Sequence, residues 1–236
     1  MAQLETIAEG VYGANTEFKL GGGIKLPLRM TVLHLDEGLA LIAPIPIDDA
    51  LAAELEALAP VRFILAPNLL HYAYVNAAAE RYPDARVLGV TGLSEKKPNV
   101  KFDGVLEAGS LTDEVDTFAL RGADKLNEMV FLHHPSSTLV VTDLVFNIHG
   151  ATGMSKLVLG MMSRALGRVE QSRLCRWLTH DRDAAGQSVA EILALPFDRV
   201  VMAHGNVIER QAKAELTAGL WWMRGHKRRE EPVHAS

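Results

Sequence analysis

The sequence predicts a mixed α/β fold in which helices cover β-sheets. Continuous apolar runs, typical of strands buried on both faces, alternate with segments whose leucines recur at helical spacing. The chain has 236 residues, of which 48% are hydrophobic and 22% charged. This composition belongs to a protein with a packed core and excludes disordered, collagen-like and coiled-coil chains. We expect one domain over residues 1–223 and a mobile polar tail over residues 224–236.

The first part of the chain predicts a hairpin followed by alternating strands and helices. Residues 6–12 and 30–35 carry β-branched and aromatic side chains, and the glycines at 21–23 lie between them. This pattern favours two paired strands joined by a flexible loop. Asp48 precedes leucines at helical spacing, as a helix N-cap does. In order, we expect a strand at 39–42, a helix from Asp48 to Pro60, a strand at 61–65, a helix at 75–82, a strand at 86–90 and a loop at 94–101.

The second part of the chain begins with strands and ends with helices. The turn signal Pro135-Ser136-Ser137 separates two apolar runs. Residues 144–180 are rich in Leu, Met and Arg, which predicts helical structure interrupted by glycines. We expect strands at residues 115–120, 129–132, 139–142 and 199–203, and helices at residues 188–195 and 207–222.

Charge, cysteine content and hydropathy exclude several classes of protein. The formal net charge is -5, so the excess of Lys and Arg that nucleic-acid binding needs is missing. Cys175 is the only cysteine, which excludes an intrachain disulfide and a cysteine-rich zinc site. The first residues lack a signal-peptide pattern, and the apolar run at 39–47 is half as long as the ~18 residues of a membrane span. We therefore expect a cytoplasmic protein without an integral membrane segment, acting on a small molecule.

Polar residues follow four of the predicted strands. In folds where helices cover sheets, ligands gather beyond the carboxyl ends of the strands. Residues at these ends are separated in sequence but can converge in space. They are Asn68 and His71, Asp124, Asp143, and His204.

Three short motifs resemble a known family. They are Ala66-Pro67-Asn68-Leu69-Leu70-His71, Pro135-Ser136-Ser137-Thr138-Leu139, and Thr142-Asp143-Leu144, and a terminal His204-Gly205 accompanies them. With the order of elements, they resemble the metallo-β-lactamase fold superfamily, and within it the DUF4336-type branch, whose metal motif is degenerate here. The resemblance covers the chain up to about Trp222 and implies a four-layer αββα sandwich of two similar halves.

The resemblance also implies a reduced set of metal ligands. In the superfamily, a strand runs into a His-x-His-x-Asp-His motif. In this chain Ala66, Asn68 and Leu70 stand where its first three metal ligands would be, and only the last position keeps its histidine, His71.

Two later positions match the superfamily better. Asp143 matches its metal-bridging aspartate, and His204 matches its terminal histidine. The implied site therefore holds at most one divalent metal ion, bound by His71, Asp143 and His204. Two histidines and one carboxylate suit zinc acting on water, and they are also ligands of mononuclear iron; manganese is the third candidate.

Four residues have more than one interpretation. Asn68 either hydrogen-bonds a substrate oxygen or caps the following helix. Asp124 is predicted to orient the attacking water or to act as a base. His133 is a further candidate because one of the adjacent histidines at 133 and 134 can face a site. Lys96 is predicted either to steer an anionic substrate or to lie solvated in its loop.

Two functions remain open on the sequence. The first is a metal-dependent hydrolase that acts on a small ester, amide, thioester or phosphoester. The second is a metal-free pseudoenzyme that binds a small ligand or a protein partner in the same cleft, which the apolar residues Leu69 and Leu70 favour. The Met-rich residues 154–162 predict core packing, a lid, a membrane-surface patch or an oligomer contact.

Overall fold

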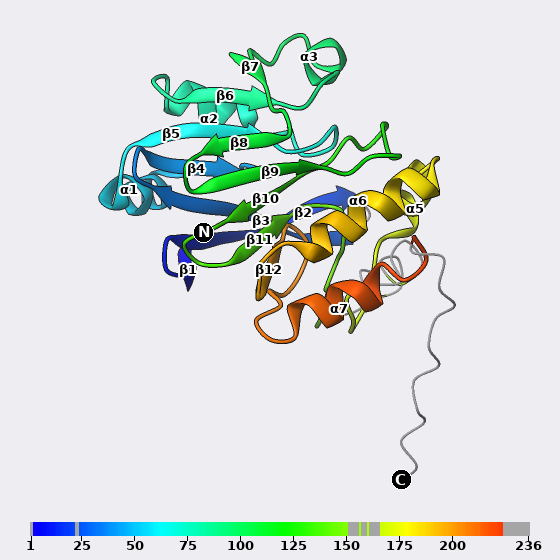
Figure 1. Ribbon diagram of the computed structural model, residues 1–236. Coiled ribbons are helices and arrows are strands. Elements are labelled where there is room, and N and C mark those ends of the chain that lie inside the picture. Colours follow the sequence, from blue (N-terminus) through cyan, green and yellow to red (C-terminus); the bar gives the residue numbers. More distant parts are fainter. Residues whose placement is uncertain (1, 22–23, 151–155, 157–159, 161–165, 224–236) are drawn as a thin grey trace.

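Two β-sheets lie against each other at the centre of the protein, and helices cover the outer face of each sheet (Figure 1). The computed structural model describes residues 2–21, 24–150, 156, 160 and 166–223. The order of layers is helix, sheet, sheet, helix. This architecture confirms the predicted four-layer sandwich.

The first sheet has seven strands that follow one another in chain order. The pairs from β1 to β4 are antiparallel, and the pairs from β4 to β7 are parallel. Strand β4 is buried along its whole length, because layers cover both of its faces. The strands are β1 (Leu4–Ala8), β2 (Val11–Gly21), β3 (Ile24–Leu35), β4 (Gly38–Ile42), β5 (Val61–Ala66), β6 (Arg86–Gly89) and β7 (Gly104–Val105).

The second sheet has five strands in the order β12-β11-β10-β9-β8. Strands β11 and β12 are parallel, and the other pairs are antiparallel. The strands are β8 (Gly109–Thr112), β9 (Val115–Ala119), β10 (Met129–His133), β11 (Thr138–Val141) and β12 (Arg199–Met202).

Strand β10 shows how the layers are held together. All five of its residues are buried, and successive side chains point to opposite faces. Met129 and Phe131 pack in the core between the two sheets, whereas Val130 and Leu132 pack in the core beneath the helices of the second half. A strand buried on both faces therefore reads as a continuous apolar run rather than as an alternating one.

The helices divide between the two outer faces. Leucines and alanines of α1 and α2 pack in the first core, and residues of α5, α6 and α7 pack in the second. Asp48 caps α1 as predicted, because its side chain accepts a hydrogen bond from the backbone N–H of Leu51. The helices are α1 (Asp49–Leu58), α2 (Val75–Arg81), α3 (Leu93–Lys96), α5 (Arg173–Leu178), α6 (Arg182–Ala194) and α7 (Ala212–Gly219).

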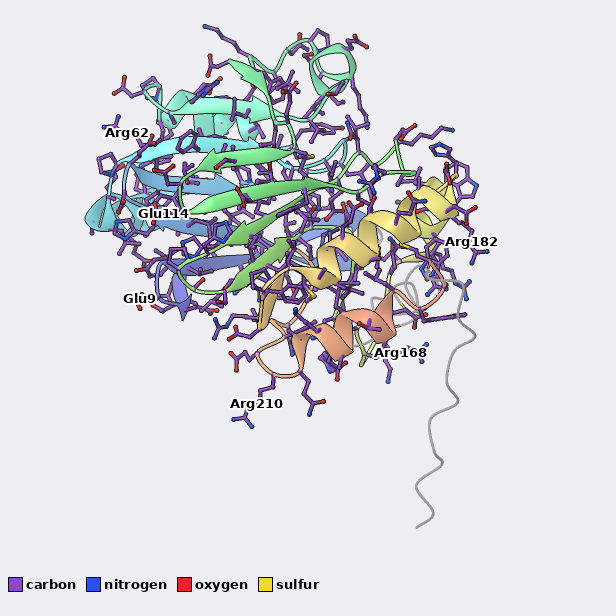
Figure 2. The ribbon with its side chains drawn as sticks, viewed as in Figure 1. Glu9, Arg62, Glu114, Arg168, Arg182 and Arg210 are labelled. Atoms are coloured by element: carbon purple, nitrogen blue, oxygen red, sulfur yellow. The ribbon has the colours of Figure 1, made fainter. Side chains whose placement is uncertain are left out.

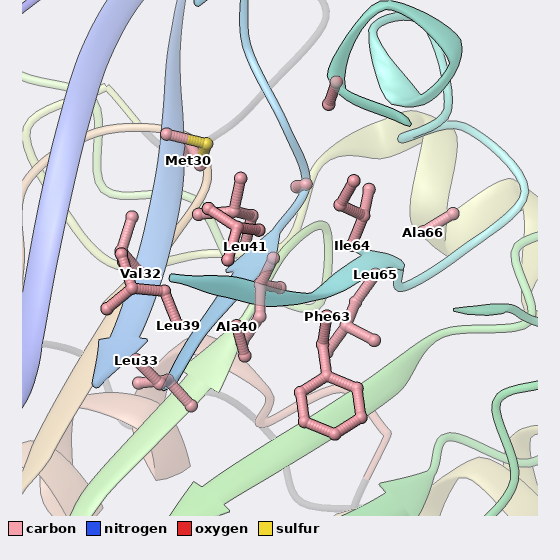
Figure 3. Packing of buried hydrophobic residues seen from close by; sticks show 14 of the residues in the cluster. Met30, Val32, Leu33, Leu39, Ala40, Leu41, Phe63, Ile64, Leu65 and Ala66 are labelled. Atoms are coloured by element: carbon pink, nitrogen blue, oxygen red, sulfur yellow. The ribbon is translucent and has the colours of Figure 1, made fainter. Parts of the chain in front are cut away.

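Apolar and charged side chains separate clearly between inside and outside. Figure 3 shows the labelled side chains of β3, β4 and β5 gathered in the first core, Leu41 and Ile64 among them. Charged side chains such as Arg62, Arg182 and Arg210 project outward at the edge of the molecule (Figure 2). Burial of the apolar sheet faces is therefore the main driving force for this fold.

Two predictions for the first half of the chain are wrong in detail. The strand expected at residues 6–12 is interrupted by a turn at Gly10, whose φ of 70° is easily adopted by glycine. The turn divides the segment between β1 and β2, which pair with each other. The loop expected at residues 94–101 begins within helix α3, a single turn that starts at Leu93.

Three predictions for the second half also need correction. Residues 144–148 are not helical: Phe146 forms an isolated bridge with Glu170, and Ile148 forms one with Leu166. Helix α6 starts at Arg182, earlier than predicted, because Asp181 caps it. Helix α7 is shorter than predicted, because Ile208 bridges back to β12.

Some expectations lie outside the described residues. The polar tail at 224–236 is one of them, and the Met-rich segment at 154–162 is another except for residues 156 and 160. Within the described ranges, no helix is both long and apolar enough to cross a membrane.

Candidate metal centre

Strand register brings Asp143 and His204 together. Strands β11 and β12 are parallel neighbours, and Val141 lies opposite Met202 at their last pair. Each candidate residue follows its strand by the same two-residue step, so the two side chains leave the same edge of the sheet side by side. The sequence prediction that these strand ends converge is confirmed.

The loop after β5 brings His71 to the same place. The backbone N–H of Met129, at the start of β10, donates to the carbonyl of Pro67 and joins the two sheets at this end. The Asn68 side-chain oxygen then accepts hydrogen bonds from the N–H groups of Leu70 and His71, at 2.8 and 2.9 Å. This turn, typical of Asn after a strand, fixes the backbone that carries His71.

Three side chains meet at this edge. His71 Nε2 lies 3.2 Å from Asp143 Oδ2, and His204 Nε2 lies 3.3 Å from Asp143 Oδ1. The ligand atoms of all three residues lie within 4.8 Å of one another. The ring centroids of the two histidines are 5.1 Å apart. The residues predicted as metal ligands therefore form one cluster.

Asn68 has a different role from the one predicted for a substrate contact. Its side chain is fully buried, and its amide nitrogen donates to Asp143 Oδ2 at 2.8 Å and to Thr142 Oγ1 at 2.9 Å. Both amide hydrogens and the amide oxygen are thus engaged inside the protein. The interpretation as a structural turn residue fits, and the prediction that Asn68 hydrogen-bonds a substrate oxygen is wrong in this structure.

Strand β3 fixes the orientation of His204. The ring Nδ1 lies 2.7 Å from the carbonyl oxygen of Pro27, and a carbonyl can only accept, so Nδ1 carries the proton. The Arg29 backbone N–H donates to the carbonyl of Ala203, and its guanidinium donates to the carbonyls of Met202 and Gly205. This contact of β3 with the end of β12 leaves His204 Nε2 facing Asp143.

Glu128 supports the backbone that carries Asp143. Its fully buried carboxylate accepts hydrogen bonds from the N–H groups of Thr142 and Asp143, at 2.7 to 3.1 Å. Burial and the charge of Asp143 raise the pKa of the Glu128 carboxyl to about 7, although the backbone donors oppose the shift. Glu128 is a positioning residue that touches the backbone after β11 rather than the cluster cavity.

Asp143 is ionised in this arrangement. Burial alone would raise the pKa of its carboxyl, but the neighbouring imidazoles of His71 and His204 outweigh burial and lower the pKa. Asp143 therefore presents a carboxylate to both histidines.

The cluster fits a divalent cation. With Nδ1 of His204 protonated, a neutral ring directs the lone pair of Nε2 at Asp143 Oδ1, 3.3 Å away. Two acceptors at this distance require a positive charge between them, which is either a proton or a metal ion. Ligand atoms at roughly 2.0–2.2 Å from a tetrahedral zinc ion are roughly 3.3–3.6 Å apart. The two distances found here are close to this range, but one ends at Oδ2 and the other at Oδ1 of Asp143.

The cluster opens into a largely apolar cavity. The cavity has a volume of about 320 Å³, and His71, Asp143, His204 and Ser172 give it a polar wall. Ser172 also caps helix α5, because its hydroxyl accepts from the N–H of Cys175. A ligand in this cavity would therefore contact the cluster.

The structure does not bring Asp124 to the cluster. Its side chain is 81% exposed and lies 3.5 Å from His180. Ala123 and Leu126 of the same loop are buried in the second core, and their burial turns Asp124 outward. The prediction that Asp124 acts on water at this site is wrong.

His133 and Lys96 both lie outside the cluster. His133 is buried at the opposite end of β10 from Met129 and pairs with Ser136 Oγ at 2.7 Å. The Lys96 ammonium lies near the site loop, where it donates to the carbonyl of Leu69 at 2.7 Å. Neither residue is among the described residues that line the cavity.

Several supporting residues carry no signal in the sequence. Pro27 and Arg29 belong to strand β3, which is far from His204 in the sequence and meets it only in the folded protein. Ser172 lies in the segment predicted as helix. A polar residue that follows a strand can be recognised in the sequence as a candidate ligand. A backbone carbonyl that orients such a residue cannot be recognised, because every residue type has one.

Comparison with known proteins identifies the fold. Residues 16–187 match the family described as domain of unknown function DUF4336. No curated protein matches the chain at a significant level. A metallo-β-lactamase from Pontibacter korlensis aligns with 96% of this chain and 100% of its own, with 12% identity and a TM-score of 0.65.

Two further solved structures share the fold. The metallo-β-lactamase FIM-1 from Pseudomonas aeruginosa, in its mono-zinc form, aligns with 95% of this chain and 96% of its own, with 12% identity and a TM-score of 0.64. The metal-soaked Flv1 flavodiiron core from Synechocystis sp. PCC6803 aligns with 94% of this chain and 60% of its own, with 12% identity and a TM-score of 0.61. At these identities the likeness is one of fold, and the predicted metallo-β-lactamase architecture is confirmed.

Proposed function

The chain belongs to the DUF4336 family and has a metallo-β-lactamase fold, and from this premise we propose that it is a hydrolase that uses one divalent metal ion. The observation that carries the proposal is the cluster of His71, Asp143 and His204, whose ligand atoms lie within 4.8 Å of one another. Zinc is the first candidate and iron or manganese the others, because two imidazoles and a carboxylate suit all three.

The residues of the chain divide the work. His71, Asp143 and His204 hold the cation, and Asn68 and the carbonyl of Pro27 keep these ligands in orientation through their hydrogen bonds. When bound, a divalent cation supplies Lewis-acid chemistry, which activates water for hydrolysis near neutral pH. The cavity beside the cluster then positions a small ester, amide, thioester or phosphoester for attack.

Only one metal ion is proposed because the donors for a second are missing. Ala66 and Leu70 carry no ligand atom in their side chains, and Asn68 already uses its amide within the protein. A mechanism that needs two adjacent cations has too few donors among these residues.

One observation favours a second candidate function. The distances of 3.2 and 3.3 Å between Asp143 and the two histidines also suit hydrogen-bonded ion pairs in which the histidines are protonated. In that state the protein binds a small ligand in the cavity without metal, as a pseudoenzyme.

Metal analysis separates the two functions. Purified protein is incubated with excess zinc, iron(II) or manganese, desalted at neutral pH and measured by elemental mass spectrometry. We expect about one ion per chain in the wild type, because three ligands converge, and almost none in His204→Ala or Asp143→Asn.

The matched control is His134→Ala. It also removes one histidine from an ion pair, but His134 pairs with Asp116 at the surface and has 41% of its side chain exposed. This variant should retain the wild-type metal content. Equal, non-zero metal content in the wild type and in His204→Ala would remove the metal site, and absence of metal from both would favour the pseudoenzyme.

A further inference from the structure

The cavity beside the cluster has a strongly apolar wall that the proposed function does not use. The apolar wall begins at the cluster itself, because the ring centroids of Phe146 and His204 are 4.5 Å apart. Strands β2 and β3 supply one side, the loop after β5 another, and helix α5 a third. The apolar residues that line it include Phe18, Leu26, Leu28, Leu70, Phe146 and Leu174.

No Lys or Arg is among the described residues that line this cavity. Two cations of neighbouring segments are engaged elsewhere: the Lys96 ammonium donates to the carbonyl of Leu69, and the Arg29 guanidinium donates to those of Met202 and Gly205. The charged side chain that faces the cavity is the carboxylate of Asp143, and the proposed cation lies beside it at the cluster end. A carboxylate or phosphate placed against the apolar wall, away from the cluster, would lie in an apolar space without a counter-charge, which is strongly unfavourable.

We propose that this cavity binds an uncharged apolar acyl chain, so that the substrate is a neutral ester, thioester or amide of a fatty or other apolar carboxylic acid. This substrate class rests on the proposed hydrolase function. For an ester, hydrolysis adds the oxygen of water to the carbonyl carbon, breaks the bond from that carbon to the alcohol oxygen, and passes a proton from water to the leaving oxygen. The apolar wall holds the acyl chain while His71, Asp143 and His204 lie at the carbonyl end.

A matched pair of ligands tests the class directly. Octan-2-one mimics the acyl chain and carbonyl of an ester but cannot be hydrolysed. In 7-oxooctanoate the terminal methyl group of the same chain is replaced by a carboxylate. Binding of both is measured by nuclear magnetic resonance titration, in chelator-treated protein and again in zinc-loaded protein.

We expect octan-2-one to bind at least about tenfold more tightly than 7-oxooctanoate in the chelator-treated protein, because the Asp143 carboxylate faces the cavity and its apolar wall lacks a counter-charge. In the zinc-loaded protein the preference should be smaller, because the ion offers the carboxylate a counter-charge. Equal affinities in the chelator-treated protein, or tighter binding of the carboxylate there, would overturn the proposal.

A pair of variants on α5 tests the location. Leu174 lines the cavity and is 46% exposed, so Leu174→Asp should fold and should weaken octan-2-one binding at least about fivefold. Trp177 is 74% exposed on the same helix and does not line the cavity, so Trp177→Asp should bind like the wild type. Equal binding in Leu174→Asp and the wild type would also overturn the assignment.

The two proposals fail in different ways. Because ketone binding is measured without metal, a preference for octan-2-one in a protein that takes up no zinc would support the cavity assignment and refute the hydrolase. A protein that binds one zinc ion but prefers 7-oxooctanoate after the zinc is removed would leave the metal centre in place and refute the apolar substrate class.

Discussion

The side chain of Asn68 organises the cluster without being one of its three members. Its oxygen accepts from the N–H groups of Leu70 and His71, and its nitrogen donates to Asp143 and Thr142. Asn68 thereby links the loop after β5 to the loop after β11, and these two strands belong to different sheets. Loss of these bonds should disturb both His71 and Asp143.

We predict that Asn68→Ala lowers the free energy of unfolding by about 2–3 kcal/mol, because buried donors and acceptors lose their partner. It should also weaken zinc binding by roughly 10–100-fold, the usual effect of losing a residue that orients metal ligands. Urea denaturation and a zinc titration against a competing chelator measure the two quantities.

Asn76→Ala is the control for this prediction. Its amide donates to the carbonyl of Asn99 at the exposed start of α2, so its loss should change the unfolding free energy by less than about 1 kcal/mol. If Asn68→Ala matched this control in stability and in zinc affinity, Asn68 would have no organising role.

His133 makes a separate prediction about pH. Burial lowers the pKa of its imidazole below the ordinary 6.5, and the charge of His134 acts in the same direction, while Glu114 opposes them. The folded protein therefore binds fewer protons than the unfolded chain at pH values just below 6.5. The contribution of His133 is full above that pH and is lost progressively as the pH falls toward the folded-state pKa.

We predict that the stability advantage of the wild type over His133→Asn shrinks as the pH falls from about 7.5 to about 5.5, by at most about 1.4 kcal/mol per pH unit. Urea denaturation at several pH values measures it. His134→Asn, which alters an exposed neighbour, should keep most of the wild-type slope, because burial is the larger cause of the lowered pKa of His133. An advantage over His133→Asn that did not change with pH would show that the His133 ring does not titrate differently in the folded protein.

At the scale of elements, the end of β12 depends on a close approach of two backbones. Gly205 has a φ of 109° and lies against Asn147, so an added Cβ would overlap the Asn147 carbonyl. The same two segments are joined by hydrogen bonds from Asn147 N–H to the His204 carbonyl and from Asn206 N–H to the Asn147 carbonyl. The glycine in the His-Gly pair therefore allows the backbone after β12 to pack beside the segment after β11.

We predict that Gly205→Ala lowers the free energy of unfolding by about 3–5 kcal/mol, since it adds backbone strain and a clash. Gly92→Ala is the control, because Gly92 also has a positive φ, of 82°, but has open space where a Cβ would be. Its cost should be about 1–2 kcal/mol, from strain alone. Equal losses in the two variants, measured by urea denaturation, would mean that the close approach to Asn147 is unimportant.

At the scale of the whole molecule, the sequence predicts the strands of the core well. Strands such as β4 and β10 are buried on both faces, so their residues form apolar runs that local reading detects. The members of the cluster could also be predicted, because His71, Asp143 and His204 each follow such a run. The resemblance to the family then predicted how these strands are arranged in two sheets.

The remainder depends on contacts between distant segments. Asn68 meets Asp143 across 75 positions of sequence, and His204 meets the Pro27 carbonyl across 177. Nothing local distinguishes Asn68, which is turned inward, from Asp124, which is turned outward by the burial of its neighbours Ala123 and Leu126. Loop direction therefore decided which strand-end residues reach the site.

The proposed metal centre consists of one ion held by His71, Asp143 and His204. It can be tested by a crystal structure of the zinc-loaded protein, with anomalous diffraction recorded on both sides of the zinc absorption edge. We expect a single zinc peak bound by Nε2 of both histidines and by the Asp143 carboxylate, with the two rings oriented as they are here. A map without a peak at this cluster, or with zinc held by other residues, would contradict it.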